Sequence, residues 1–211
     1  MTIRDILLIL LTAFWTLTYI FAVVYAFRNK THAIPPFSVS LNFAWEIIAL
    51  FYYFEYVDIA WIIVDVFIVA LLIKEFINNK NKKSFLYLIP FICYSIICAL
   101  LFNKQFSDGL SGYIFLSFAM DLVMAIDFNL EFKEKQRLKK IDLMLWLVAL
   151  FKLLGDATAL TIYRMYPLVL IFGIAVLVFN TIYIYRVSKN LFGKQQKKTS
   201  VKKSKKKRKR L

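Results

Sequence analysis

The sequence predicts an all-α membrane protein, a seven transmembrane helix bundle with the N-terminus out and the C-terminus in. The 211 residues are 61% hydrophobic with a mean hydropathy of +0.65, well above the values of soluble domains. Seven apolar runs have roughly the 20 residues that a helix needs to cross a bilayer core of about 30 Å. Basic residues concentrate in alternate connections between these runs.

The apolar runs cover residues 6–27, 37–54, 57–77, 85–102, 111–132, 141–163 and 166–187. The clearest breaks are the Pro35-Pro36 pair and the charged segments 78–83 and 131–140. The first run is N-terminal, as a secretory signal would be. It is about 22 residues long, lacks a strong small-x-small cleavage site and leads directly into the next run, so we expect it to be retained.

The distribution of Lys and Arg predicts the orientation of the bundle. The first, third and fifth connections hold two, three and five of them, and thirteen follow from residue 186 onward. The N-terminus and the fourth and sixth connections hold one each, and the second holds none. Since positive charge stays on the cytoplasmic side, the C-terminus is expected inside. Residues 1–190 are therefore expected to form one membrane domain.

Residues 191–211 form a polybasic tail that supplies much of the net charge of +15. The segment KKTSVKKSKKKRKRL has low complexity and cannot bury a core, so we expect the tail to be disordered. Anionic lipid would attract it by about 1 kcal/mol per basic residue near the surface. Nucleic-acid binding is the alternative, but the tail lacks interleaved aromatic residues and a reading fold. We therefore expect anionic lipids, and not nucleic acid, as its partner.

Several acidic residues lie inside apolar runs, and four of them are candidate site residues. They are Glu46 in NFAWEIIALF, Asp65, Asp121, and Asp156, which follows Lys152 at i, i+4. An acid at mid-membrane costs about 2.5 to 3.5 kcal/mol, so such residues face the bundle interior and are functional by default. The alternative is that each acid only hydrogen-bonds to a neighbouring helix or pairs with the lysine.

The second and third runs are expected to form a hairpin that brings two acids together. Asn42, Trp45 and Glu46 share one side of the second helix, and Trp61 and Asp65 share a face of the third. Because the connection is short, the two carboxyl groups could approach each other. Two carboxyls in a low-dielectric site do not readily both ionise, a condition that suits one of them to act as a general acid.

Aromatic residues make up 18% of the chain. Their faces can stabilise a cation in a dry pocket by roughly 2 kcal/mol or more, although the same residues also form interfacial belts. The single His32 lies beside Pro35 and Pro36 with no Cys or second His nearby, so we expect a structural or interfacial role and no metal site. No cofactor is expected.

The segment Asn42-Phe-Ala-Trp45-Glu46, followed by Trp61-Ile-Ile-Val-Asp65-Val, resembles the membrane-integral terpene cyclases of fungal meroterpenoid and indole-diterpene pathways, a family with bacterial members. The resemblance is best over residues 28–76 and topological elsewhere. It implies metal-independent, proton-initiated cyclisation of a prenylated, in many cases epoxidised, lipophilic substrate. It also implies a bacterial relative located in the cytoplasmic membrane.

The resemblance assigns Glu46 as a catalytic acid and expects a second, an aspartate, in the last helix. Asn180 stands at that position, which passes the second carboxyl role to Asp65, Asp121 or Asp156. We take the first and last of these, with Glu46, as the candidate catalytic residues. Asn42, Trp45, Trp61, Asp121 and Asn180 are the candidate substrate-binding or supporting residues.

Other functions remain open from the sequence. Magnesium-dependent ionisation of a diphosphate is disfavoured, since the chain contains no Asp-Asp-x-x-Asp cluster. A noncatalytic family member and a small proton-coupled transporter or sensor are the alternatives. The transporter lacks support from an internal repeat or a broken helix pair. A retinal-binding receptor lacks its lysine, because no Lys lies between Tyr166 and Tyr185.

Overall fold

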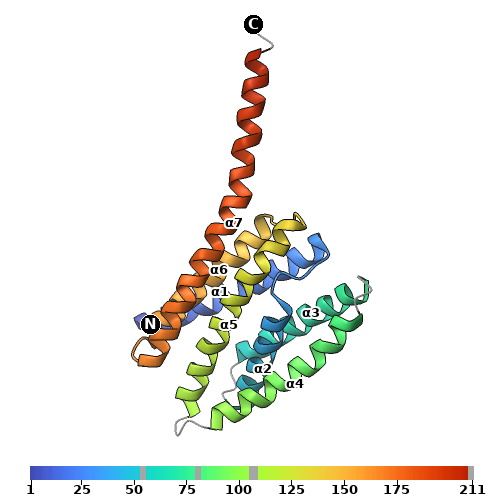
Figure 1. The fold of residues 1–211 in the computed structure, drawn as a ribbon. Helices are drawn as coiled ribbons and strands as arrows, with labels where there is room; N and C mark the ends of the chain where they lie inside the picture. Colours follow the sequence, from blue (N-terminus) through green and yellow to red (C-terminus); the bar gives the residue numbers. More distant parts are fainter. Residues whose placement is uncertain (53–55, 79–81, 105–108, 209–211) are drawn as a thin grey trace.

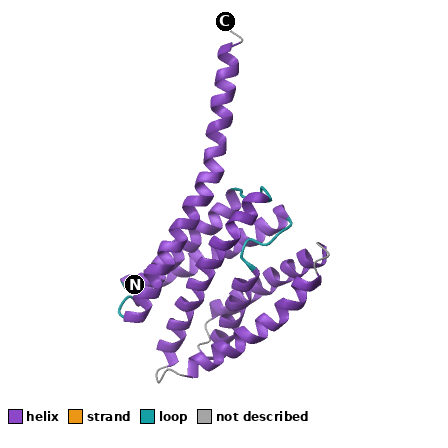
Figure 2. Ribbon diagram, in the orientation of Figure 1, coloured by secondary structure: helices purple, strands orange, loops and turns teal. Residues whose placement is uncertain are grey.

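The structure, a computed structural model, describes the backbone of residues 1–52, 56–78, 82–104 and 109–208, and the side chains of residues 1–51, 59–78, 89–101, 104 and 112–193. All regular elements in these ranges are helices (Figure 2). They are α1 (Ile3–Asn29), α2 (Pro36–Tyr52), α3 (Tyr56–Asn78), α4 (Lys82–Lys104), α5 (Gly109–Arg137), α6 (Leu143–Tyr163) and α7 (Pro167–Arg208). Each predicted apolar run corresponds to one of them.

Local capping accounts for the ends of two helices. Thr2 and Asp5 form a capping box at the start of α1, and the helix ends where Lys30 adopts a left-handed conformation with φ of 51°. Asp142 precedes α6 and accepts a hydrogen bond from the backbone N–H of Leu145 at 3.0 Å. These contacts satisfy backbone groups that a helix end would otherwise leave unpaired.

Four helices in the described part of the chain are long and apolar enough to cross a membrane: α1, α5, α6 and α7. The apolar parts of α2 and α4 that are described are shorter, and the described part of α3 carries Asp65, Lys74 and Glu75. The all-α class is therefore confirmed, with four candidate spans identified by length and composition.

The helices form two groups, as Figure 1 shows. In the first, α1 packs mainly on α6, and α7 packs on both α5 and α6. In the second, α2 lies between α3 and α4. Contacts of α2 and α4 with α5, and of α1 with α3, join the groups.

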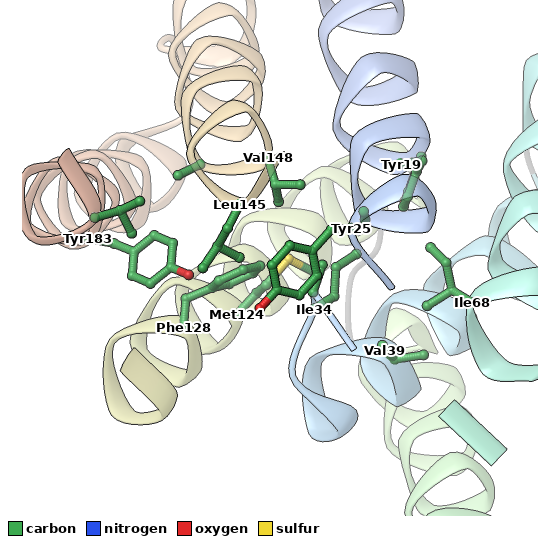
Figure 3. Close-up of a cluster of buried hydrophobic side chains, with 14 of the residues drawn as sticks. Tyr19, Tyr25, Ile34, Val39, Ile68, Met124, Phe128, Leu145, Val148 and Tyr183 are labelled. Carbon is green, nitrogen blue, oxygen red and sulfur yellow. The ribbon is translucent and has the colours of Figure 1, made fainter. Parts of the chain in front are cut away.

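A cluster of buried apolar side chains lies where the groups meet (Figure 3). Tyr25 of α1 is fully buried there, and its hydroxyl donates a hydrogen bond to the Lys140 carbonyl oxygen at 2.7 Å. Tyr183 of α7 packs its ring edge-on against Phe128 of α5, with ring centroids 5.1 Å apart. The cluster therefore fixes the relative positions of α1, α5 and α7.

The tail continues α7, which runs without a break through residue 190 to Arg208 (Figure 1). Lys, Arg and Gln have favourable helix propensities, which is compatible with such an extension. The predicted domain boundary at residue 190 and the predicted disorder of residues 191–211 stay predictions.

His32 joins three parts of the bundle. Its Nδ1 lies 2.9 Å from Glu75 Oε2 of α3, and its Nε2 lies 3.1 Å from Glu131 Oε2 of α5. Lys135 also donates to Glu131 at 2.6 Å. Because both partners of the ring are carboxylates, which only accept, both ring nitrogens must donate and the imidazole is charged. The structural role expected for His32 is confirmed.

Stability should depend on pH through His32. Burial opposes the charged imidazole, but the hydrogen bonds with Glu131 and Glu75 outweigh burial and raise the pKa of His32. A raised folded pKa means that the stabilisation is fully present below the unfolded pKa, about 6.5, and is lost as pH rises through the folded pKa. We expect the melting temperature of the detergent-purified protein to fall over that interval. In His32→Gln this part of the pH dependence should disappear, and its persistence would contradict the assignment.

Gly173 allows α7 to approach α6 closely. A Cβ at this position would collide with Leu160 Cδ1 and would lie 3.1 Å from Phe118 Cε1, whereas a Cβ at Gly193, also in α7, would meet nothing within 4 Å. Both Gly→Ala changes gain similar helix propensity, but only the first must also displace the end of the Leu160 side chain and the Phe118 ring, so it should stabilise the fold less. Gly173→Ala should therefore unfold at a lower temperature than Gly193→Ala, and equal melting temperatures would contradict the packing.

Candidate active site

A cavity of about 230 Å³ opens between the two groups of helices. Side chains from α1, α2, α3, α5 and α6 line it. Its polar lining includes two carboxyl groups, Glu46 of α2 and Asp121 of α5, and the amide of Asn42. Aromatic residues make up much of the remaining wall. This combination, an apolar pocket with a few convergent polar groups, is typical of a small-molecule site.

Glu46 belongs to a hydrogen-bonded network that connects three helices. Tyr19 of α1 donates its hydroxyl to Glu46 Oε1 at 3.4 Å. The Asn42 amide donates both to the Tyr19 oxygen and to Asp65 Oδ2 of α3, each at 2.6 Å. Glu46 and Asp65 are 1% and 2% exposed. The two acids of the predicted hairpin are therefore linked through Asn42 and Tyr19.

Three tryptophans belong to the aromatic part of the wall. Trp45 stacks on Tyr113 of α5, with ring centroids 4.9 Å apart. Trp61 of α3 donates its indole N–H to Thr16 Oγ1 at 3.2 Å, and Trp15 of α1 lies next to Tyr19 with ring centroids 6.0 Å apart. These contacts fix the rings at the edge of the cavity, where their faces could stabilise positive charge.

A second polar cluster lies behind Asp121. Lys152 Nζ of α6 is 2.6 Å from Asp156 Oδ2 and 3.7 Å from Asp121 Oδ1. Asn180 of α7 donates to the same Oδ2 of Asp156 at 2.5 Å. The ammonium also lies 5.1 Å from the centre of the Trp15 ring. All four polar side chains are buried, and their mutual contacts offset the unfavourable transfer of charge from water.

The structure sorts the predicted site residues into two sets. The residues that line the cavity are Glu46, Asn42, Trp45, Trp61 and Asp121. Asp65, Asp156 and Asn180 are outside the lining. Asp65 contacts the lining residue Asn42, whereas Asp156 and Asn180 contact each other. All four acids are buried, so the prediction that they face the interior of the bundle is confirmed.

Sequence reasoning missed two residues of α1 that line the cavity, Trp15 and Tyr19. Helix α1 has no charged residue in its central part, so it carries no charge that would indicate a site there. The i, i+4 spacing of these two large aromatic residues, each with a polar N–H or O–H, was the available signal. In the described part of the chain, no group of three His, Cys, Asp or Glu side chains is arranged to hold a metal ion.

Comparison with known proteins identifies the family. A family model for Pyr4-like transmembrane terpene cyclases matches residues 1–127, more than half of the 211 residues. The match includes Glu46, Asp65 and Asp121 and confirms the resemblance drawn from the motifs on α2 and α3. No curated protein and no solved structure matches the chain. The chain is therefore an integral membrane protein and belongs to the family of Pyr4-like transmembrane terpene cyclases.

Proposed function

We propose that the protein is a metal-independent terpene cyclase that starts cyclisation of a prenylated lipophilic substrate by proton transfer. The observation that carries this proposal is the cavity lined jointly by Glu46, Asp121 and three tryptophans, in a chain of the terpene cyclase family. An open cavity beside Glu46 also favours an enzyme over a noncatalytic family member.

Glu46 is the proposed proton donor. Its carboxyl O–H would protonate either the terminal epoxide oxygen or the terminal double bond of the prenyl chain. In the first case the C–O bond breaks, the oxygen becomes a hydroxyl group, and the cation that remains on carbon is attacked by the next double bond. Loss of a proton from the last cation, to water or to the Glu46 carboxylate, would form an alkene and end the reaction. The Tyr19 hydroxyl, which contacts Glu46 Oε1 at 3.4 Å, would orient the carboxyl and stabilise the carboxylate that forms.

The surrounding residues have proposed supporting roles. Trp15, Trp45 and Trp61 would stabilise the cation through their ring faces. Asn42 would orient Tyr19, and Asp65 would in turn hold the Asn42 amide, since the two are 2.6 Å apart. Because Asp65 does not line the cavity, its proposed role is to position other residues and not to contact the substrate.

Asp156 and Asn180 are likewise proposed to position other groups. Asp156 accepts hydrogen bonds from Lys152 and Asn180. None of these three residues lines the cavity. The last helix therefore contributes an amide donor in place of a carboxyl. We propose that this donor holds Asp156 in place and that the chemistry uses the carboxyl groups facing the cavity.

We also propose that all seven helices cross the membrane with the N-terminus out and the basic C-terminal tail in the cytoplasm, as the distribution of Lys and Arg favours. For a bacterial relative the membrane would be the cytoplasmic membrane. The thirteen basic residues from Arg186 onward would bind anionic lipid headgroups on that side.

Replacing Glu46 tests the cyclase proposal. Purified Glu46→Gln should cyclise prenylated substrates with terminal epoxides at least about 10²-fold more slowly than wild type, because general acid catalysis typically contributes that much or more. Gln keeps an acceptor for Tyr19, so folding should be preserved. The measurement is product formation by mass spectrometry over a panel of such substrates. Glu134→Gln, an exposed change of the same kind, is the control. Turnover at the wild-type rate by Glu46→Gln would refute the role of Glu46.

Protease protection tests the topology and the tail together. Trypsin should remove the tail in sealed inverted membrane vesicles and leave it intact in right-side-out vesicles. After reconstitution with the tail exposed, anionic lipid should slow its cleavage relative to neutral lipid, and added salt should abolish the difference, because salt screens the attraction. Cleavage in right-side-out vesicles only would reverse the topology, and equal cleavage rates on both lipids would remove the lipid partner.

A further inference from the structure

The cluster behind Asp121 holds an unequal number of charged groups. Lys152, Asp121 and Asp156 are 3%, 4% and 1% exposed. One ammonium faces two carboxyls, so with all three ionised the cluster would carry a net negative charge in an apolar interior. Burial of an uncompensated charge is strongly unfavourable, and a carboxyl in such a place takes up a proton instead. One proton must therefore be held by the two aspartates.

The hydrogen bonds indicate which aspartate is ionised. Lys152 Nζ and Asn180 Nδ2 both donate to a single oxygen, Oδ2 of Asp156, at 2.6 and 2.5 Å. Two short bonds from donors, one of them charged, stabilise a carboxylate and offer no acceptor for a carboxyl proton on that oxygen. Oδ1 of Asp156, like Oδ1 of Asp121, has no hydrogen-bond partner among the described residues, so the two donors on Oδ2 are what distinguishes Asp156 from Asp121. Asp156 is therefore the carboxylate that pairs with Lys152.

Asp121 has a different environment. Its Oδ1 is 3.7 Å from Lys152 Nζ, beyond hydrogen-bond distance, and has no hydrogen-bond partner among the described residues. A carboxylate here would lack the donors that Asp156 receives. We propose that Lys152 is a positioning residue which, by pairing with Asp156, leaves the single proton of the cluster on Asp121, the member that lines the cavity.

A contact with Trp15 helps to hold the Lys152 ammonium in place. The ammonium lies 5.1 Å from the centre of the Trp15 ring, within the range of a cation–π interaction, and Lys152 does not line the cavity. The ammonium can thus control the charge of Asp121 without contacting a ligand. Because its Nζ is closer to Asp156 than to Asp121, the Lys152 ammonium stabilises the negative charge of Asp156.

A neutral Asp121 gives the cavity a second carboxyl O–H in addition to Glu46. The consequence for catalysis rests on the proposed cyclase function. Glu46 becomes a carboxylate once it has donated its proton, so an ionised Asp121 would place a second carboxylate beside the carbocation, where it could form a C–O bond or remove a proton early and so end cyclisation. A neutral acid does neither readily. Asp121 would therefore line the site of the cation without terminating the reaction.

Infrared spectroscopy of the purified protein tests the protonation state without any substrate, so the result does not depend on whether cyclisation is found. A protonated carboxyl has a carbonyl stretching band that a carboxylate lacks. Asp121→Asn should lose one such band relative to wild type at neutral pH, and Asp121→Ser should lose the same band if the first variant folds poorly. Glu134→Gln, which changes an exposed carboxylate, should leave the band intact.

Replacing Lys152 tests its positioning role. In Lys152→Met both aspartates lose their cation, so both should become protonated and one additional carbonyl band should appear. In wild type, labelling aspartate with ¹³C at its carboxyl group should shift the band assigned to Asp121 and leave glutamate bands in place. An unchanged spectrum in Asp121→Asn, or the absence of any label-sensitive protonated band in wild type, would overturn the proposal. No additional band in Lys152→Met would overturn the role of the lysine.

Discussion

The bundle depends on hydrogen bonds that satisfy its buried polar groups, and among the described residues those of the Asn42 amide connect the most helices at one side chain. Its two N–H groups donate to Tyr19 of α1 and Asp65 of α3 while Asn42 itself belongs to α2. Three helices therefore meet at one side chain, and Tyr19 extends the network to Glu46. Removing this amide would leave buried acceptors unsatisfied, a penalty of about 1 to 3 kcal/mol for each neutral group and more for charged ones.

The candidate site combines a part that the family match covers with a part that lies beyond it. The family match covers residues 1–127 and so contains Glu46, its network and Asp121. The groups behind Asp121, namely Lys152, Asp156 and Asn180, come from α6 and α7, beyond the match. The cavity forms where these parts meet, with a carboxyl group from α2 and another from α5.

The role inferred for Asn180 depends on the residues that surround it. By resemblance an acid is expected in the last helix, and the amide found there would suggest a lost function. In the structure it donates to Asp156, one helix away, and so stabilises a carboxylate that already pairs with Lys152. A further acid at residue 180 would instead add negative charge to a cluster that already contains two acids and one cation. The amide is thus consistent with the charge balance around it.

The seven helices, their approximate ends except the C-terminal end of α7, and the burial of the four acids followed from the sequence, because apolar runs of bilayer length and acids within them leave few alternatives. The position of Trp45 and Glu46 on one side of α2 followed in the same way, and both line the cavity. The sequence did not determine which acids reach a common cavity, because the depth of a residue along a helix says little about how that helix is rotated about its axis relative to its neighbours. Tertiary packing decided that Asp121 faces Glu46's cavity while Asp65 and Asp156 lie behind it. It also brought Tyr19 and Trp15 of α1 into the site, since contacts between distant segments arise only when the helices assemble.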